Sequence, residues 1–288
     1  MFSLLCFLSL QKSILERVRE AVEGKSNSIV MRLFGSSVSY IRGCLFRVLS
    51  VGPVPSHLAF ILDGNRRYAR KWNLGEGMGH RAGFLSLMTI MKYCYQLGVK
   101  YVTIYAFSID NFKRKPDEVQ AVMDLMLEKI EGLLKEERII KQYGVRVEFV
   151  GNLKLLSDAV RVAAEKAMRA TAVNSRAILL IAVAYTSTDE IVHAVHESRL
   201  DIGEAKGVIK VDDVEKHMYM GVAPDPDILV RTSGETRLSN FLLWQTSSSL
   251  LYSPRALWPE MGLRHLVWAV LNFQRVQPYL ERRRKKLM

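Results

Sequence analysis

The stretch LAFILDGNRRYAR, residues 58–70, places five apolar residues directly before an aspartate, a glycine, an asparagine and three arginines. A short, continuous apolar run that ends at turn residues is typical of a strand buried on both faces. Such strands occur mainly in parallel sheets that are covered by helices. The stretch therefore predicts an α/β fold in which charged residues follow a buried strand.

Short apolar runs alternate with longer helical segments along the rest of the chain. Pro116 before two acidic residues and Ser157 before Asp158 are helix-start signals. The pattern predicts a mostly parallel central sheet of about six strands flanked by helices. The expected strands are 58–62, 101–107, 145–150, 178–185 and 227–230, the last of them taken as the final strand. The expected helices are 80–97, 116–143, 157–170, 187–198 and one from about 263, with 200–210 as a surface loop.

A glycine and two prolines within 52–55 predict a turn between an N-terminal extension, residues 1–52, and a main domain, residues 53–288. Between Glu23 and Asp63 there is no acidic residue, and apolar residues recur at steps of three and four over 29–49. This amphipathic pattern is typical of a helix on a membrane surface, and equally of a helix packed on the protein's own core. The opening MFSLLCFLSL lacks the basic start and cleavage site of a secretory signal.

The formal net charge of +12 indicates anionic partners, such as nucleic acid, a lipid surface or phosphate-bearing small molecules. A nucleic-acid binder is not expected, because no reading motif and no interleaving of basic and aromatic residues is present. Cys6, Cys44 and Cys94 have neither metal-ligand spacing nor the pairing of a disulfide framework. We interpret them as small apolar residues of a protein in a reducing compartment.

Polar and charged residues follow three of the expected strands, where ligands collect in parallel α/β sheets. After the first strand they are Asp63, Gly64, Asn65, Arg66, Arg67 and Arg70, and after the second they are Ser108, Asp110, Asn111, Lys113 and Arg114. After the last strand they are Arg231, Thr232, Ser233, Gly234, Glu235, Arg237 and Ser239. Guanidinium groups and glycine backbone N–H groups are good partners for phosphate oxygens. Because no nucleotide-binding signature occurs, the phosphates are not expected to be held as in ATP or NAD sites.

Individual residues of these segments allow two interpretations. Asp63 is expected to hold a divalent cation shared with phosphate, as Mg²⁺ usually is, or to be only a turn residue before Gly64. Ser239 is expected to lie at the start of a helix with the sequence NFLLW, either as its cap or as part of an anion site. His80 is expected either to contact phosphate or transfer a proton, or to be purely structural.

The segments HLAFILDGNRRYAR, GHRAGF, YVTIYAFSIDNFKRKPDEV and DILVRTSGETRLSNFLLWQTS, followed by ALWPE, resemble those of the cis-prenyltransferases. This family comprises undecaprenyl and dehydrodolichyl diphosphate synthases, including a plant branch linked to dolichol and rubber. The resemblance covers about residues 52–280. It implies an enzyme that adds isopentenyl diphosphate units, with cis double bonds, to an allylic diphosphate such as farnesyl diphosphate, using Mg²⁺.

The resemblance also implies roles for individual residues. Asp63 is expected to bind the metal and, with Asn65, Ser108 and Asn111, to act in catalysis. Substrate binding is expected of the remaining residues. These are Gly64, Arg67 and His80, which with Asn65 surround the allylic diphosphate, and Arg66 in the same segment. The others are Phe112, Arg114 and Glu118 in and beyond a closing loop, and Arg231, Arg237 and Ser239 around isopentenyl diphosphate. Six apolar residues are expected either to line a tunnel for the growing chain or to belong to the ordinary core. They are Phe84, Leu87, Met91, Met123, Leu127 and Leu134.

Three departures from the bacterial pattern point to the eukaryotic class of the family. Leu250 replaces a glutamate, Glu76 replaces an arginine, and the C-terminus lacks an Arg-x-Gly tail. In that class a second subunit resembling the Nogo-B receptor completes the site, so weak or no activity is expected of the chain alone. Peripheral attachment to the cytosolic face of the endoplasmic reticulum is expected as well. The alternative is a non-catalytic scaffold subunit, which is expected to have lost Asp63 and much of the loop after the first strand. Against this alternative, the chain retains Asp63, Asn65, Arg67, Arg231, Arg237 and Ser239.

Overall fold

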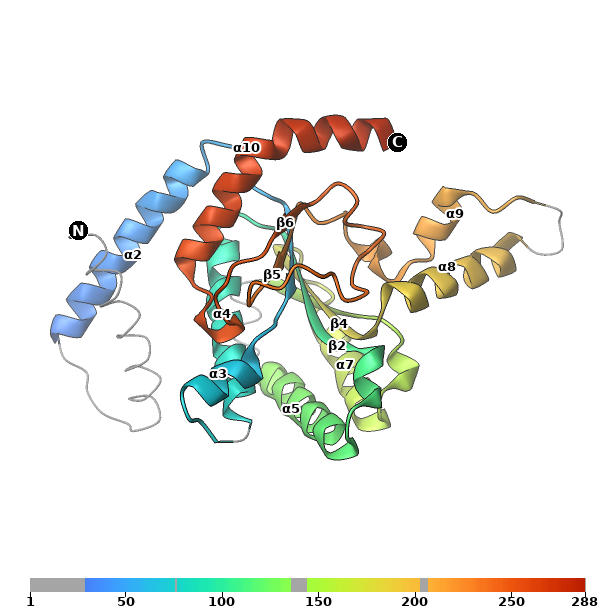
Figure 1. Cartoon of the computed structure of the whole chain (residues 1–288), viewed down its shortest axis with the longest axis horizontal. Helices are drawn as coiled ribbons and strands as arrows, with labels where there is room; N and C mark the ends of the chain where they lie inside the picture. Colours follow the sequence, from blue (N-terminus) through green and yellow to red (C-terminus); the bar gives the residue numbers. More distant parts are fainter. Residues whose placement is uncertain (1–28, 76, 136–143, 203–206, 288) are drawn as a thin grey trace. The chain divides into compact units, whose positions relative to one another are not determined.

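The structure is a computed structural model that describes residues 29–75, 77–135, 144–202 and 207–287. Contacts divide the chain into two compact units between Val48 and Leu49. In the first unit α2 (Ile29–Leu49) begins, as the apolar period predicts, and it is one of the helices in Figure 1. The opening stretch and Cys6 lie outside the described residues, and the domain boundary at residues 52 and 53 stays a prediction. No described helix combines the length and apolar character that crossing a bilayer requires.

The second unit is built on one sheet, which within the described residues has six strands in the order β3-β4-β2-β1-β5-β6. All neighbouring strands are parallel, so the predicted fold class is confirmed. The strands are β1 (His57–Ile61), β2 (Tyr101–Ser108), β3 (Val145–Val150), β4 (Ala177–Tyr185), β5 (Ile228–Arg231) and β6 (Leu250–Tyr252).

Helices and short 3₁₀ turns connect the strands, as Figure 1 shows. The helices of this unit are α3 (Asn65–Lys71), α4 (Met78–Leu97), α5 (Pro116–Lys135), α7 (Asp158–Thr171), α8 (Ser187–Ile202), α9 (Val211–Lys216) and α10 (Leu263–Leu287). The 3₁₀ turns are η1 (Ile109–Lys113), η2 (Leu153–Leu155), η3 (Tyr219–Val222) and η4 (Trp258–Glu260).

The central strands are buried because elements cover both faces of the sheet. Every residue of β1 and β5 is buried, which explains why both strands are apolar apart from His57 and Arg231 and show no apolar/polar alternation. On one face α5 and α7 pack against β2, β3 and β4 through a cluster that includes Met123, Val160 and Phe149. On the other face Met220 and Phe241, from the segments around β5, pack against Ala59 and neighbouring strand residues.

Several sequence-based boundaries need correction. The strand ending at residue 230 is not the last one, because the short strand β6 pairs with β5 at the sheet edge. Three residues are too few to show an apolar period, so the sequence gives no clear signal for this strand. The expected loop from residue 200 is helical to Ile202 at the end of α8. The C-terminal charged run continues α10 to Leu287, with Arg284 bonded to Asp227 at 3.2 Å.

Candidate active site

The parallel sheet brings the three predicted polar segments together at the carboxyl ends of its strands. β1 lies between β2 and β5, and Ile61 is opposite both Tyr105 and Arg231. Asp63 follows β1 by two residues, so it lies directly beyond Arg231 at the carboxyl end of the sheet. This is where ligands bind in open α/β folds.

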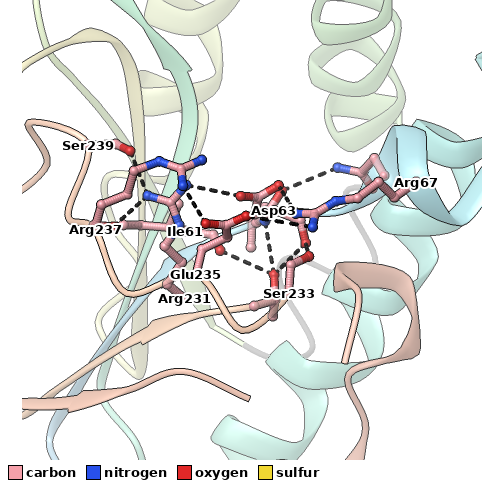
Figure 2. A network of polar contacts seen from close by, with 11 residues as sticks. Ile61, Asp63, Arg67, Arg231, Ser233, Glu235, Arg237 and Ser239 are labelled. Atoms are coloured by element: carbon pink, nitrogen blue, oxygen red, sulfur yellow. Dashed lines mark hydrogen bonds and ion pairs between the residues drawn. The ribbon is translucent and has the colours of Figure 1, made fainter. Parts of the chain in front are cut away.

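The Asp63 carboxylate lies between two guanidinium groups, as Figure 2 shows. Arg67 Nη2 donates to Oδ1 at 3.0 Å, and Arg231 Nη2 donates to Oδ2 at 3.0 Å. Burial raises the pKa of Asp63, but hydrogen bonds and charge from Arg231 and Arg67 outweigh it, so this pKa lies below its ordinary value. The carboxylate is therefore ionised at neutral pH.

The backbone around Asp63 is fixed from three sides. The Asp63 carbonyl accepts hydrogen bonds from the Thr232 hydroxyl at 2.6 Å, from the Ser233 hydroxyl at 2.8 Å and from the Trp258 amide at 2.9 Å. Gly64 has a φ of 121°, and a Cβ atom on it would lie 2.6 Å from Ser233 Oγ. Glycine is required at this turn because no larger residue fits there in that conformation.

Arg231 joins Asp63 to the loop that follows β5. Its side chain is only 7% exposed, and Nη1 donates to Ser239 Oγ at 2.6 Å and to the Arg237 carbonyl at 2.5 Å. Arg231 Nε is a buried donor with no acceptor among the described residues. The Arg237 side chain is 64% exposed, and its Nη1 donates to Glu235 Oε2 (Figure 2).

The helix expected to begin after Ser239 does not form, so that prediction is wrong. Residues 239–248 make turns, and Ser239, Asn240 and Leu242 have φ values of 51°, 56° and 48°. Positive φ values interrupt a right-handed helix. Tyr105 in β2 stacks on Phe241 with ring centroids 4.3 Å apart, which holds the turn segment against the sheet.

Glu235 brings a second carboxylate into the arginine cluster. Its Oε1 lies 3.7 Å from Arg67 Nη1, and its Oε2 accepts a hydrogen bond from Arg237 Nη1. Sequence reasoning placed Glu235 after β5 but gave it no role. The signal that could have identified Glu235 is its position two residues before Arg237, which is a predicted substrate-binding residue.

Asn65 lies where α3, α4 and Trp258 meet. Its Nδ2 donates to the Leu62 carbonyl at 3.4 Å, and its Oδ1 is buried without a partner among the described residues. A Cβ atom on Gly83 would lie 2.2 Å from Asn65 Oδ1. Trp258 Nε1 donates to the Gly83 carbonyl at 2.9 Å, so a small residue at position 83 lets three segments approach closely.

A second group of predicted residues gathers between α3, α4 and α5. Arg66 Nη1 lies 3.8 Å from Glu118 Oε2, although 52 positions separate them in the chain. Burial, followed by the charges of Arg66 and Arg114, lowers the pKa of His80. His80 therefore stays neutral at neutral pH in the ligand-free protein and lies in the field of two arginines.

The loop after β2 uses its predicted residues to hold its own fold. Ser108 Oγ accepts from the Asp110 amide at 3.1 Å, and Asn111 Oδ1 accepts from the Ser108 amide at 3.2 Å. Phe112 packs edge-on against Phe107 with centroids 4.9 Å apart. These contacts order η1 at the strand end, and the catalytic roles of Ser108 and Asn111 stay predictions.

Among the expected tunnel residues whose side chains are described, Leu87 and Met123 are buried, and Phe84, Met91 and Leu127 are half-buried. Met123 and Leu127 belong to the core cluster under α5, and Leu87 is buried on α4. Lys129 on α5 lies 5.1 Å from the Phe84 ring on α4, so these two helices are neighbours. The side chain of Leu134 and residue Glu76 lie outside the described part. Leu250 in β6 is opposite Ile228 in β5, and Ile228 lies three residues before Arg231 in that strand.

The donor set decides which kind of cation the site fits. Among the described residues no three His, Cys, Asp or Glu side chains gather as metal ligands. Asp63 alone offers a carboxylate that is both central and fixed. Mg²⁺ commonly takes one or two carboxylates and completes its shell with water and phosphate oxygens. The site therefore fits a cation that shares its coordination with a bound diphosphate, with Asp63 as the protein ligand.

Sequence reasoning gave no role to the residues that fix the site from behind. Thr232, Ser233 and Trp258 donate to the Asp63 carbonyl, and Tyr105 stacks on Phe241. Of these four residues, only Thr232 and Ser233 lie within one of the predicted polar segments. Trp258 lies 195 positions after Asp63 in the chain. No local pattern could have placed it there.

Comparison with known proteins gives a family match over most of the chain. Residues 61–281 match the sequence model of a family described as "Putative undecaprenyl diphosphate synthase". The chain is 56% identical over 289 residues to dehydrodolichyl diphosphate synthase 6 of Arabidopsis thaliana, covering 92% of this chain and 97% of that one. It is 56% identical over 276 residues to rubber cis-polyprenyltransferase HRT2 of Hevea brasiliensis, covering 90% and 96%.

A human relative and a solved structure extend the match. The human protein, dehydrodolichyl diphosphate synthase complex subunit DHDDS, is 41% identical over 242 residues, covering 82% of this chain and 72% of that one. The crystal structure of lavandulyl diphosphate synthase from Lavandula x intermedia, in complex with dimethylallyl diphosphate, aligns with a TM-score of 0.72. It is 27% identical and covers 77% of this chain and 95% of that chain. The chain is therefore an enzyme of the undecaprenyl diphosphate synthase family, a cis-prenyltransferase.

Proposed function

We propose that this enzyme condenses isopentenyl diphosphate units onto an allylic diphosphate, farnesyl diphosphate, to give a long-chain cis-polyprenyl diphosphate. The observation that carries the proposal is the Asp63 carboxylate held between Arg67 and Arg231 at the carboxyl end of the sheet. Two diphosphate groups need several fixed cationic partners close together, and this cluster supplies them.

The two substrates are assigned to opposite sides of Asp63. Arg67 with Gly64, Asn65 and His80 would bind the allylic diphosphate, with Arg66, Arg114 and Glu118 at the edge formed by α5. Arg231, Arg237 and Ser239 would bind isopentenyl diphosphate. Ser108, Asn111 and Phe112 would line the loop that covers the reacting groups. Because Arg67 and Arg231 both donate to the Asp63 carboxylate, the two diphosphate headgroups would lie next to each other at Asp63.

The reaction needs stabilisation of the departing diphosphate and removal of one proton. Breaking the allylic C–O bond leaves negative charge on diphosphate oxygens, and guanidinium groups fixed at that place favour this charge. Asn65 would orient the headgroup or, together with the diphosphate, assist proton removal. Asp63 would hold Mg²⁺ jointly with the diphosphate, and the ion would add positive charge at the leaving group.

A partner subunit and a membrane surface belong to the same proposal. The related human protein is named as a subunit of a complex. Leu250 and Glu76 depart from the bacterial pattern, so we propose that an accessory subunit resembling the Nogo-B receptor completes the site. We further propose that the basic, amphipathic segment over 29–49 holds the complex on the cytosolic face of the endoplasmic reticulum. No nucleic-acid partner is proposed.

The test is a product assay with the purified chain, with and without the accessory subunit. Farnesyl diphosphate, labelled isopentenyl diphosphate and Mg²⁺ are supplied, and the products are sized by chromatography. Long polyprenyl products are expected with the accessory subunit, and Asp63→Ala is expected to lower turnover by orders of magnitude while the protein stays folded. Full activity of the chain alone would refute the partner, and an active Asp63→Ala enzyme would refute the assigned centre.

A further inference from the structure

Glu235 lies between the arginines that the proposed function assigns to different substrates. Its Oε1 is 3.7 Å from Arg67 Nη1, on the allylic side, and its Oε2 accepts from Arg237 Nη1, on the isopentenyl side (Figure 2). One carboxylate thus contacts the cationic groups of both proposed diphosphate sites. The proposed function leaves this residue without a role.

A carboxylate in this place competes with the ligands of the site. N–H groups that face Glu235 cannot face a phosphate oxygen at the same time, and two anions this close repel each other. The three arginines 67, 231 and 237 already share two carboxylates, from Asp63 and Glu235. A diphosphate can therefore bind Arg67 and Arg237 fully only when the Glu235 carboxylate moves away.

The contacts of Glu235 are weaker than those of Asp63. Asp63 accepts two hydrogen bonds of 3.0 Å, one of them from the nearly buried Arg231, and its own carbonyl is held by three donors. Glu235 has a longer side chain with one more rotatable bond, and its partner Arg237 is 64% exposed, whereas Arg231, the partner of Asp63, is 7% exposed. Ion pairs at such exposure are weak, so a multiply charged ligand can displace them.

Resting on the proposed function, we propose that the Glu235 carboxylate is an internal anion that occupies Arg67 and Arg237 in the substrate-free enzyme and releases both when a diphosphate binds. Displacement by the first substrate frees the arginine of the other site as well. Each diphosphate therefore binds more tightly when the other is present, and binding to the empty enzyme is weakened.

The test measures binding of inorganic diphosphate to the full-length chain by calorimetry, in the absence of Mg²⁺ and at constant ionic strength. The variant is Glu235→Gln, which keeps the size of the side chain and removes its charge. The matched control is Asp201→Asn, because Asp201 also contacts two basic side chains, Lys216 at 3.3 Å and His217 at 2.9 Å, but lies on α8 outside the cluster. Thermal unfolding is recorded for each protein.

Glu235→Gln is expected to bind diphosphate at least fivefold more tightly than the wild type, while Asp201→Asn binds as the wild type does. A gain in affinity cannot come from damage to the fold, which would weaken binding. Equal or weaker binding by Glu235→Gln would overturn the inference and show that Glu235 instead orders the arginines. If neither the wild type nor the variant binds diphosphate, the proposed function fails at this site, and the inference fails with it.

Discussion

At the residue scale, the site depends on a few side chains that make several contacts at once. Arg231 bonds the Asp63 carboxylate, the Ser239 hydroxyl and the Arg237 carbonyl with one planar group. A guanidinium can hold three such partners because its donors point in fixed, different directions. Arg237, in contrast, donates to Glu235 from an exposed position.

This difference predicts unequal effects of the same substitution at the two arginines. Arg231→Lys is expected to lower kcat/KM for isopentenyl diphosphate at least tenfold, because an ammonium group cannot replace all three contacts, and charge-assisted hydrogen bonds contribute about 1.5–3 kcal/mol each. Arg237→Lys keeps the charge in an open position and is expected to cost about threefold or less. Steady-state kinetics of the complex tests this, and equal losses would contradict it.

At the element scale, the glycines of α4 decide how closely α3 approaches it. Cβ atoms on Gly79 and Gly83 would lie 2.3 Å from the Asn65 carbonyl oxygen and 2.2 Å from Asn65 Oδ1. These glycines are four residues apart and so lie on one face of the helix. The contact of α3 with α4 therefore fixes Asn65, and through it one side of the proposed allylic site.

A pair of glycine-to-alanine substitutions separates packing from helix propensity. Gly83→Ala is expected to lower the free energy of unfolding by about 1–3 kcal/mol, because the new methyl group overlaps Asn65 and Trp258. It should also lower activity by displacing Asn65. Gly132→Ala on α5 meets no atom within 4 Å and is expected to stabilise the protein by up to about 1 kcal/mol.

Urea unfolding and the product assay measure both variants side by side. A Gly83→Ala protein as stable and active as Gly132→Ala would show that α3 and α4 can separate without consequence. That result would remove Asn65 from the list of residues fixed by packing.

At the scale of the whole molecule, buried polar groups stabilise the amino-terminal ends of β1 and β5, at the end of the sheet opposite the site. Asp227 Oδ2 accepts from the Ser56 and His57 amides at 2.6 and 3.1 Å. His57 is fully buried, with Nδ1 2.6 Å from the Pro224 carbonyl and Nε2 2.7 Å from Thr103 Oγ1. Because a carbonyl only accepts, the neutral ring carries its proton on Nδ1 and accepts from Thr103 through Nε2.

This histidine predicts how global stability depends on pH. Burial lowers the pKa of His57 to about 4, although the Pro224 hydrogen bond and Asp227 act against the shift and Arg284 acts with it. The folded pKa is below the unfolded value of 6.5, so the unfolded state takes up a proton first as the pH falls. The stabilisation is complete above pH 6.5 and is lost between 6.5 and about 4, with a slope of about 1.4 kcal/mol per pH unit.

The measurement is urea unfolding of the wild type and of His57→Gln between pH 7.5 and 4.5. The wild type is expected to lose stability more steeply below pH 6.5 than the variant. His265, whose pKa also lies at about 4 through burial, is present in both proteins and so cancels in the comparison. Parallel curves would show that His57 does not titrate differently in the two states.

The sequence by itself determined the fold class and most elements of this protein. Continuous apolar runs such as 58–62 are typical of strands covered on both faces, and α5 begins at Pro116 and α10 at Leu263, where the sequence predicts helices to start. The residues after the strands were predictable too, because parallel strands align their carboxyl ends. These conclusions need only local patterns and the regular geometry of a parallel sheet.

Only the tertiary structure decided which of these residues touch. Asp63 and Arg231 are separated by 168 positions, and the register of β1 against β5 places them together. Contacts between distant segments also place Trp258 against the Asp63 carbonyl and Glu235 between two arginines. The same holds for the turn after Ser239, whose positive φ values exclude a helix. Local sequence patterns report the shape of each segment, whereas the position of a side chain in the site depends on how the segments pack.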